Sequence, residues 1–492
     1  MPRRIRSRVL PCWRDPAAVF ERWFAGAEHV VWLDGGDDAS GVSVLGRAHP
    51  GSEFVVARLA GDAGTAGRVE VSRPGADAAP TTVREGEVFP LLAEALAMPV
   101  VELEPGAPSP GPLGWFGWFG YELGAAADGV AVAHAETPDA AFLFLDRVIV
   151  FDHAARVVRL VWLDSDDDDS NDDSGGADAW ADEQQAALGD GFSGEAATRD
   201  APAADGTPAT EHPPVARWRH DAARYAELID ACQAAIVRGD AYQLCLTNRV
   251  DLDVHPDPAG TYLALRASSP SHHGGYVRFG EFSLLSASPE LFLHIEPTGL
   301  VSTKPMKGTR PRDADPARDA ALRAELLASD KERAENLMIV DLMRNDLGRI
   351  AELGSVGVDG LLEVEEYPHV HQLVSTVRAR IAPQLTAVDV VRAAFPAGSM
   401  TGAPKHSAMS ILHGLEEGPR GVYSGAFGYL GVDGGADLAM VIRSIVLAPS
   451  GASIGTGGGI TALSIAAEEI EETRVKARAL LAVLGAASTR PE

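Results

Sequence analysis

GVYSGAFGYLGVDGGADLAMVIRSIVLAPSGASIGTGGGIT, residues 421–461, is the stretch of the chain that decides its fold. Short apolar runs alternate here with turns that contain Gly, Asp, Pro and Ser. This pattern predicts a strand, a turn, a second strand, a second turn and a third strand. Sheet structure is therefore expected in the carboxyl-terminal part of the chain.

Further strand and helix signals surround this stretch. Residues 221–240 and 329–350 have apolar side chains at helical spacing, and the first of these helices should end at Gly239. A last helix is expected from about Ala466 to Leu484. FSLLSASPELFLHIE, residues 282–296, indicates two strands around a Ser-Pro break. Residues 215–488 thus predict one domain in which helices and strands alternate.

The amino-terminal part also contains strand signals, such as HVVWLD and VVRLVWL, which favour an α+β domain over residues 1–163. Between the two parts, residues 164–214 are rich in Asp, Ala, Gly and Pro. Such a segment buries too little apolar surface to offset its ordering entropy, so a flexible linker is expected. A calcium-binding loop that starts at Asp164 would need Gly and Glu where the chain has Asp169 and Gly175.

Composition excludes several classes of function. The chain has 492 residues, 46% of them apolar, and a formal net charge of −28. Such an acidic chain disfavours nucleic-acid binding, because the phosphate backbone would repel it. No apolar run is long enough for a membrane span, and no apolar segment of a signal peptide follows the basic start. Three widely spaced cysteines indicate a reducing compartment, so the cytoplasm is expected.

Two pairs of carboxylates are the clearest chemical feature. Glu332 and Glu335 lie three residues apart on one predicted helix, and Glu469 and Glu472 lie three apart on the last one. Residues at this spacing share a helix face, so two such pairs brought together would suit Mg²⁺. A structural explanation remains open, since Ser329 and Glu332 fit a capping box. Acidic residues also stabilise the start of a helix without any metal.

GTGGGIT, residues 455–461, is expected to form a loop between a strand and the last helix. Glycines there would let backbone N–H groups approach an anion, although a tight structural turn explains them equally well. Arg443 and Lys476 are basic residues that could hold a carboxylate together with this loop.

Four further polar residues stand in or beside apolar segments: Gln243, Glu290, Lys307 and His371. Gln243 and His371 alone are more often satisfied core residues than catalysts. Glu290 could be an exposed strand carboxylate, and Lys307 a solvated charge on a loop.

Taken together, the chain resembles the chorismate-utilising enzymes. Residues 111–123 are similar to the motif of the family's amino-terminal domain, and the other segments occur in the family's order over residues 215–485. The segments that carry the resemblance are GPLGWFGWFGYEL, DAYQLCLTNRV, SASPELFL, KPMKGTRPR, DKERAENLMIVDLMRNDLGR, HVHQLVSTV, FPAGSMTGAPK, GVYSGAFGYLG, GTGGGIT and EEIEETRVKA.

The resemblance implies an α+β fold, an α/β sandwich in which two large antiparallel sheets pack face to face with helices outside. It implies Mg²⁺ as cofactor, with Glu335 and Glu472 as direct ligands and Glu332 and Glu469 acting through water. Glu290 would be the general acid and base beside the C4 hydroxyl, with His371 nearby. The implied substrate-binding residues are Gly308, Thr309, Thr401, Tyr423, Arg443, Gly457, Gly458, Gly459 and Lys476.

Two positions distinguish the branches of the family. Members that add water at C2 carry lysine where this chain has Gln243, and a neutral amide cannot deprotonate water. The anthranilate-forming branch usually has Pro-Ile-Ala-Gly-Thr, whereas the branch that aminates C4 has Pro-Ile-Lys-Gly-Thr. PMKGT, residues 305–309, keeps the lysine. Lys307 could attack C2 as the C4 hydroxyl leaves, after which ammonia attacks C4 and expels the lysine from C2. A nearby Mg²⁺ and cationic residues are expected to depress the pKa of Lys307.

The resemblance also implies partners. Chorismate and ammonia would be the substrates, and the ammonia would come from a glutamine amidotransferase on a separate chain. Some relatives bind tryptophan in the amino-terminal domain, at a segment that corresponds to VVWLDGGD, residues 30–37. Gly35 replaces a serine often found there, which argues against tryptophan binding.

C4 amination that yields 4-amino-4-deoxychorismate is therefore the leading hypothesis. Anthranilate formation and a non-catalytic chorismate-binding subunit are the alternatives.

Overall fold

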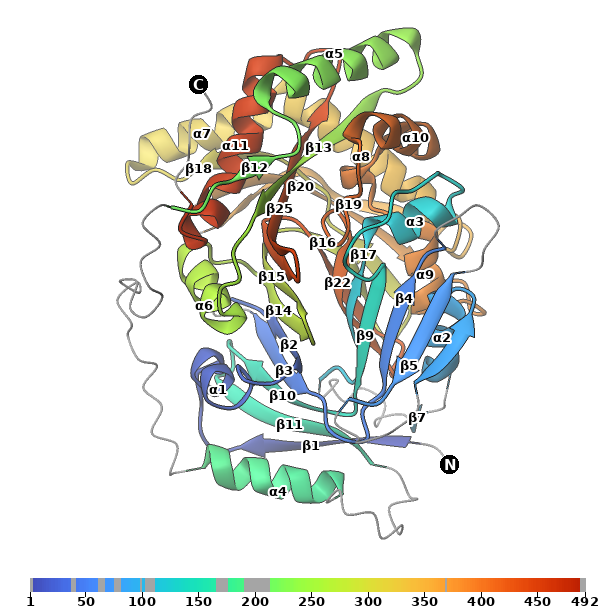
Figure 1. Ribbon diagram of the computed structural model, residues 1–492, viewed down its shortest axis with the longest axis vertical. Coiled ribbons are helices and arrows are strands. Elements are labelled where there is room, and N and C mark those ends of the chain that lie inside the picture. Colours follow the sequence, from blue (N-terminus) through green and yellow to red (C-terminus); the bar gives the residue numbers. More distant parts are fainter. Residues whose placement is uncertain are drawn as a thin grey trace.

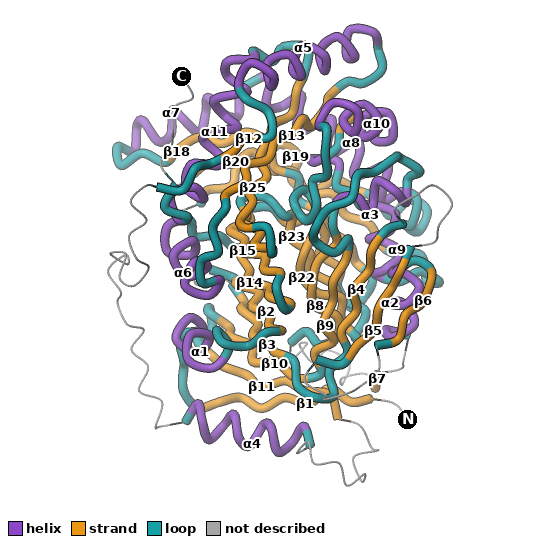
Figure 2. The backbone as a smooth tube through the Cα atoms, viewed as in Figure 1, coloured by secondary structure: helices purple, strands orange, loops and turns teal. Residues whose placement is uncertain are grey.

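Two large sheets face each other and helices cover their outer surfaces (Figures 1 and 2). The computed structural model describes residues 3–36, 41–60, 67–74, 81–97, 100–101, 111–164, 176–189, 213–367 and 370–486. The expected α/β sandwich is confirmed. Both sheets are antiparallel, except that β7 runs parallel to β1. Within the described residues, no helix is both long and apolar enough to cross a membrane.

Over the residues that the structure describes, the first sheet has 13 strands. In spatial order they are β12 (Arg217–Trp218), β13 (Gln243–Leu252), β25 (Gly451–Ile460), β24 (Ser444–Ala448), β15 (Phe282–Ser288), β14 (His273–Phe279), β2 (His29–Asp34), β3 (Val42–Arg47), β10 (Arg147–Asp152), β11 (Val157–Asp164), β1 (Arg3–Leu10) and β7 (Val100–Val101), with β21 (Gly402–Ala403) paired to β13.

The second sheet has 12 strands within the described ranges. Their order is β18 (Met306–Pro311), β20 (Val370–Arg380), β17 (Leu300–Thr303), β16 (Leu291–Ile295), β23 (Ala436–Met440), β22 (Ala426–Gly431), β8 (Gly114–Phe119), β9 (Ala140–Leu145), β4 (Phe54–Arg58), β5 (Arg68–Ser72) and β6 (Thr82–Glu85), with β19 (Gly357–Glu366) paired to β20.

The helices pack outside these sheets and at the ends of the sandwich (Figure 1). They are α1 (Pro16–Trp23), α2 (Val88–Leu96), α3 (Tyr121–Ala127), α4 (Ala177–Leu188), α5 (Ala222–Arg238), α6 (Pro258–Ser268), α7 (Pro316–Ala328), α8 (Asp330–Gly348), α9 (Ala387–Ala394), the 3₁₀ turn η1 (Gly398–Met400), α10 (Lys405–Glu416) and α11 (Ala466–Val483).

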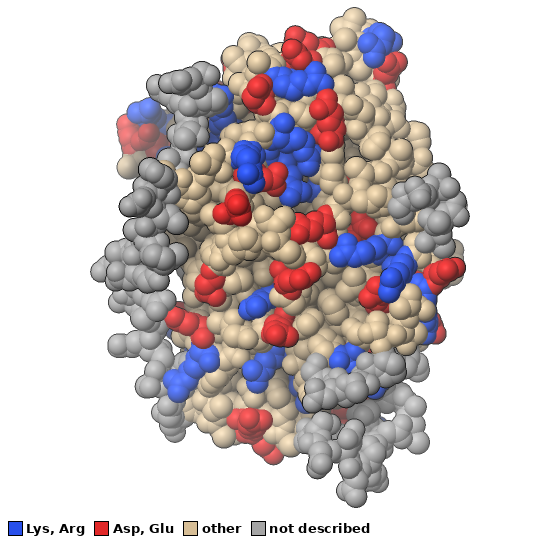
Figure 3. All heavy atoms as spheres, in the orientation of Figure 1, with Lys and Arg blue, Asp and Glu red and all other residues tan. Residues whose placement is uncertain are grey.

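Three apolar layers hold the sandwich together. Residues from both sheets, such as Val31, Trp118 and Val277, are buried between them. A second layer lies under α8 and α9, and a third lies under α1, α6 and α11. This burial supplies the main driving force for folding. Acidic and basic side chains are interspersed on the face that Figure 3 shows.

Residues 1–163 and 215–488 share both sheets. Strand β2 pairs with β14 in the first sheet, and β8 pairs with β22 in the second. Each half of the chain therefore completes sheets that the other half begins. Inside the segment expected to be a flexible linker, α4 forms and buries Ala177, Ala181 and Leu188. The expectation of flexibility was wrong for these residues, because their small and apolar side chains find a surface on β11; residues 165–175 and 190–212 lie outside the described residues.

The chain crosses between the sheets at two places that matter for the site. Residues 289 and 290 lead from β15 in the first sheet to β16 in the second. Residues 441–443 lead back from β23 to β24, and Arg443 has a left-handed backbone with a φ of 51°. Residues 421–461 therefore hold four strands, two in each sheet, and not the three expected. The crossings place Glu290 and Arg443 where the two sheets meet.

A buried guanidinium ties these elements together. Arg420 donates to both carboxylate oxygens of Glu416, at 2.8 and 2.7 Å. It also donates to the carbonyls of Met400 at 2.6 Å and Cys245 at 2.9 Å. Its guanidinium lies 4.1 Å from the centre of the Tyr121 ring. Because Arg420 and Glu416 are both buried, each depends on the other for charge compensation.

Replacing this arginine should destabilise the fold strongly. Arg420→Met should lower the free energy of unfolding by about 3–5 kcal/mol, because Glu416 stays buried without a counter-charge. The Arg420→Met/Glu416→Met double variant should lose much less than the sum of the two single variants. Denaturant unfolding measures all three.

Arg224 and Glu417 provide the matched control, since they form an exposed pair at 2.6 Å next to the buried one. Arg224→Met should cost at most about 1 kcal/mol. Equal losses for Arg420→Met and Arg224→Met would contradict the importance of the buried pair.

Candidate functional site

A cavity of about 520 Å³ contains most of the residues that the sequence singled out. Its wall carries five carboxylates and five basic side chains, so the formal charge of the lining is zero. The carboxylates are Glu290, Glu332, Glu335, Glu469 and Glu472, and the basic residues are Lys307, Arg310, Lys331, Arg443 and Lys476. Gly308, Thr309, Tyr423, Gly457, Gly458 and Gly459 line the same cavity.

Helices α8 and α11 supply four of these glutamates to the cavity wall, here called the outer glutamates. Glu332 and Glu335 lie near the start of α8, and Glu469 and Glu472 lie near the start of α11. Ser329 accepts from the backbone N–H of Glu332 at 3.4 Å, so the side-chain N-cap of α8 is present. The cap uses the backbone of Glu332, which leaves its carboxylate on the cavity wall.

The four glutamates form a donor set that fits a hard cation such as Mg²⁺. Oε1 of Glu335 is buried and accepts no hydrogen bond. Within the described residues, however, no three His, Cys, Asp or Glu side chains converge closely enough to hold a metal ion. The carboxylates pair with basic side chains instead. Lys476 Nζ lies 2.6 Å from Glu472 Oε1, and Lys331 Nζ lies 3.4 Å from Glu469 Oε1.

Lys307 lies on β18 at the wall of this cavity. Burial lowers the pKa of its ammonium, but Glu335, Glu290 and Glu472 raise the pKa, and the net shift is upward. The expected depression of the pKa of Lys307 included a bound Mg²⁺, and it stays a prediction for the metal-bound protein. The protein alone surrounds Lys307 with carboxylates, which favour its charged form.

For Glu290, the raised pKa favours the neutral form of the side chain. Burial raises the pKa of its carboxyl, although Lys307 and a hydrogen bond with Ser399 oppose the shift. A carboxyl group with a raised pKa keeps its proton closer to neutral pH and can act as a general acid. The crossing between β15 and β16 supplies this residue to the cavity.

The glycine segment 455–460 belongs to β25 and not to a loop, which corrects the expected anion loop. Strand β24 pairs only with residues 451–454, so beyond that point β25 has a partner only in β13. Lys476 donates to the carbonyl of Gly457 at 2.8 Å. A side chain at Gly459 would collide with the amide of Gln243 and would lie 3.7 Å from Lys307 Nζ.

Three expected site residues do not line the cavity. Gln243 is buried behind Gly459, and its Oε1 accepts no hydrogen bond. His371 is fully buried, and its Nε2 lies 2.9 Å from Asp319 Oδ1 on α7. Thr401 is also fully buried, and its hydroxyl donates to the carbonyls of Ala397 and Gly398 at 3.3 and 3.4 Å. His371 and Thr401 therefore support the walls from behind.

Five polar residues of the wall were not expected from the sequence: Arg310, Lys331, Gln372, Ser399 and Thr456. Both basic residues lie in motifs that carry the family resemblance. Arg310 is three residues after Lys307, and Lys331 is one residue before Glu332. Their basic charge beside the acidic residues was the available signal. Ser399 had none, because its contact with Glu290 joins distant parts of the chain.

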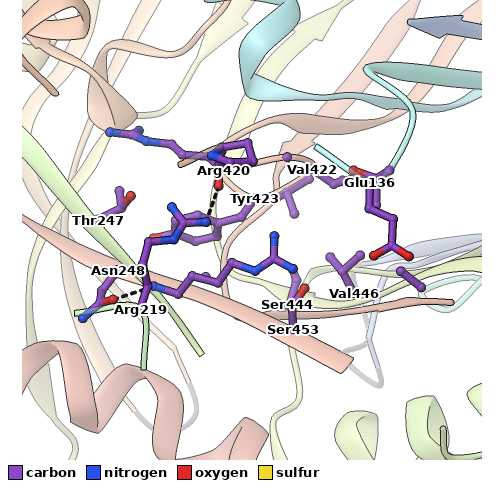
Figure 4. Close-up of a pocket in the computed structure, with 17 residues that line it drawn as sticks. Glu136, Arg219, Thr247, Asn248, Arg420, Val422, Tyr423, Ser444, Val446 and Ser453 are labelled. Atoms are coloured by element: carbon purple, nitrogen blue, oxygen red, sulfur yellow. Dashed lines mark hydrogen bonds between the residues drawn. The ribbon is translucent and has the colours of Figure 1, made fainter. Parts of the chain in front are cut away.

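Two other cavities are lined by neither the outer glutamates nor Lys307. A cavity of about 20 Å³ shares Tyr423 and Gly455 with it and has room for about one water molecule (Figure 4). Arg219 is also drawn in that wall and donates to the carbonyl of Pro419 at 2.7 Å (Figure 4). A third cavity of about 830 Å³ is lined by Asp34, Gly35 and residues of both sheets. Of these three cavities in the described part of the chain, the 520 Å³ cavity is the one that contains the glutamates and Lys307.

A family model for chorismate binding enzymes matches residues 71–482. The chain belongs to this family. An aminodeoxychorismate synthase of Streptomyces griseus is 44% identical over 491 residues, covering 99% of this chain and 65% of the relative. An anthranilate synthase component 1 of Streptomyces coelicolor is 39% identical over 379 residues, covering 75% of this chain and 72% of the relative.

The fold of the family is also found among solved structures. Anthranilate synthase component I from Streptococcus pneumoniae is 27% identical and has a TM-score of 0.71, covering 97% of this chain and 99% of that chain. In length, however, this chain spans only 65% of the Streptomyces griseus relative.

The close packing of β25 can be tested by substituting Gly459, with Gly414 in α10 as the control. Gly459→Ala should lower the free energy of unfolding by about 1–3 kcal/mol, because the new methyl group collides with the buried amide of Gln243. Gly414 in α10 has open space around its Cβ position. Gly414→Ala should raise stability by up to about 1 kcal/mol. Denaturant unfolding compares the two, and an unchanged Gly459→Ala variant would contradict the packing.

Proposed function

We propose that the chain aminates chorismate at C4, as component I of an aminodeoxychorismate synthase, to give 4-amino-4-deoxychorismate. The observation that carries this proposal is Lys307, which lies in the same cavity as Glu290 and the four outer glutamates. The similarity to an aminodeoxychorismate synthase over 99% of the chain supports it.

The charge of the cavity suits the substrate. Chorismate is a dianion with two carboxylates, and the lining is neutral overall. A divalent cation bound with the dianion would keep the filled cavity neutral, so binding of each would favour the other. We assign Arg443, Tyr423, Lys476 and the β25 glycines to the substrate carboxylates, with Gly308 and Thr309 as further contacts.

The glutamates would hold the cation. Glu335 and Glu472 are assigned as direct ligands, and Glu332 and Glu469 as ligands through water. Mg²⁺, when bound there, would neutralise the carboxylates that raise the pKa of Lys307 and would attract a carboxylate of the substrate.

The reaction is proposed to proceed in two substitutions. In the first, the neutral amine of Lys307 forms a bond to C2, the ring double bonds shift, and the C4–O bond breaks. Glu290 gives its proton to the departing hydroxyl, which leaves as water. In the second, ammonia forms a bond to C4 as the C2–N bond breaks. Lys307 leaves as an amine, and the surplus proton of the new ammonium group returns to Glu290.

Gln243 is assigned a selective role. Its amide lies behind Gly459, and a Cβ atom at Gly459 would lie 2.3 Å from the amide nitrogen of Gln243 and 3.7 Å from Lys307 Nζ. An amide does not deprotonate water near neutral pH, so it does not support water addition at C2. His371 and Thr401 are assigned as supports and not as contacts of the substrate.

Ammonia is proposed to come from a glutamine amidotransferase, and the product is proposed to lead to 4-aminobenzoate and folate.

The third cavity gives little support to a tryptophan site. A Cβ atom at Gly35 would lie 2.6 Å from the backbone N of Val42, so the serine of tryptophan-binding relatives has no room here.

Anthranilate formation is the second candidate, because the Streptomyces coelicolor relative and the Streptococcus pneumoniae structure carry that name. A non-catalytic chorismate-binding subunit is the third. Lys307 argues against the second candidate, and the complete set of glutamates argues against the third.

Product analysis by mass spectrometry separates the three. Purified chain with chorismate, Mg²⁺ and an ammonium salt should release 4-amino-4-deoxychorismate, which a lyase converts to 4-aminobenzoate. Lys307→Ala should lower the rate by at least about a hundredfold, since the covalent route is lost. Omitting ammonia should leave an adduct whose mass maps to Lys307.

Lys304→Ala is the control, because Lys304 pairs with Glu365 at 3.0 Å and does not line the cavity. It should retain activity. Fluorescent anthranilate as the direct product would sink the proposal, and an unchanged rate in Lys307→Ala would refute the covalent role. Chorismate binding without turnover would support the third candidate.

A further inference from the structure

Lys331 occupies an unusual position among the glutamates of the cavity. Its Nζ lies 3.4 Å from Glu469 Oε1 on α11 and 4.0 Å from Glu335 Oε1 on its own helix. The other outer glutamates have different basic neighbours. Lys476 pairs with Glu472, and Arg310 lies 3.7 Å from Glu332. Within the described part of the chain, Lys331 is the ion-pair partner that joins Glu335 and Glu469.

The side chains of Glu335, Glu469 and Lys331 differ in their exposure to solvent. The side chains of Glu335 and Glu469 are 9% and 4% exposed, whereas the side chain of Lys331 is 41% exposed. The carboxylates are thus fixed in the wall, and the ammonium reaches them from the solvent side on a flexible stem. A long lysine side chain at that exposure can move into water with little loss of packing.

The pairing of Lys331 with Glu335 is also incomplete. Oε1 of Glu335 accepts no hydrogen bond, so the ammonium at 4.0 Å compensates its charge without hydrogen bonding to it. A buried carboxylate oxygen in this state retains its capacity to bind a cation.

We propose that Lys331 is an internal counter-cation that partly compensates the charges of Glu335 and Glu469 in the metal-free protein and must leave them when a divalent cation binds. This inference rests on the proposed role of the glutamates as metal-binding residues. Lys331 then competes with the metal. It sets the metal affinity of the free protein below what the four carboxylates alone would give, and it keeps the carboxylates compensated between turnovers.

Direct metal binding tests the competition without any turnover. The bound fraction of Mn²⁺ can be measured by electron paramagnetic resonance in the absence of chorismate. Lys331→Met keeps the stem of the side chain and removes its charge. It should bind Mn²⁺ about tenfold more tightly than the unsubstituted chain, because no ammonium has to be displaced.

Lys304→Met is the matched control. Lys304 is 38% exposed and forms an ion pair at 3.0 Å with Glu365, so its replacement removes the same charge at similar exposure. Its Mn²⁺ affinity should stay within about twofold of that of the unsubstituted chain. A gain as large as that of Lys331→Met would reduce the effect to net charge and overturn the inference.

Chemical labelling gives a second measurement. Acetylation by an N-hydroxysuccinimide ester, mapped by mass spectrometry, should increase at Lys331 when Mn²⁺ is added, because the amine is released to solvent. Labelling of Lys304 should not change. Equal labelling of Lys331 with and without bound Mn²⁺ would overturn the proposed displacement.

The outcomes distinguish a failure of the proposed metal site from a failure of the proposed role of Lys331. If the unsubstituted chain binds Mn²⁺, Glu335→Gln loses it, and Lys331→Met binds with unchanged or weaker affinity, the inference fails while the metal site stands. If neither the unsubstituted chain nor Lys331→Met binds Mn²⁺ at millimolar concentration, the metal site and the inference fail together.

Discussion

The buried ion pair of Arg420 and Glu416 is the interaction on which the site depends. Its guanidinium joins carbonyls of β13 and η1 to a carboxylate of α10. The backbone N–H groups of Arg420 and Gly421 donate to Glu122 on α3, at 2.7 and 3.0 Å. This network fixes the start of the segment that carries Tyr423 into the cavity. A fully satisfied buried pair of this kind specifies one arrangement of the elements it connects, since any other leaves a charge uncompensated.

The two crossings between the sheets explain why charged groups meet in the interior of a sandwich. Within a sheet, inward-facing side chains are expected to be apolar, as they are between β8, β9 and β14. A crossing interrupts the strand pairing and exposes a short backbone segment at the edge of the apolar layer. Glu290 and Arg443 lie in these two segments, which are joined by backbone hydrogen bonds, and both residues line the same cavity. The helices α8 and α11 then add the remaining carboxylates from outside the sheets.

Much of this could be predicted from the sequence, because the signals are local. The helix over residues 221–240 ends at Gly239 in a left-handed conformation, as its pattern indicated. The carboxylate pairs lie on the expected helices and line one cavity. The errors arise where the outcome depends on distant residues. The glycines 455–460 look like a loop in isolation, but β13 provides a partner strand for them. Helix α4 depends in the same way on the surface of β11, and the placement of His371 depends on Asp319.

The electrostatics of Lys307 connect the fold with the proposed chemistry. A nucleophilic lysine is usually activated by burial or by neighbouring cations, which lower its pKa. Here the carboxylates outweigh burial, and the amine is held in its charged form. An ammonium group has no lone pair with which to attack carbon. Under the proposed function, the amine would become a nucleophile once a bound divalent cation neutralises the surrounding carboxylates. The same glutamates that would hold the metal would then also control when Lys307 can react.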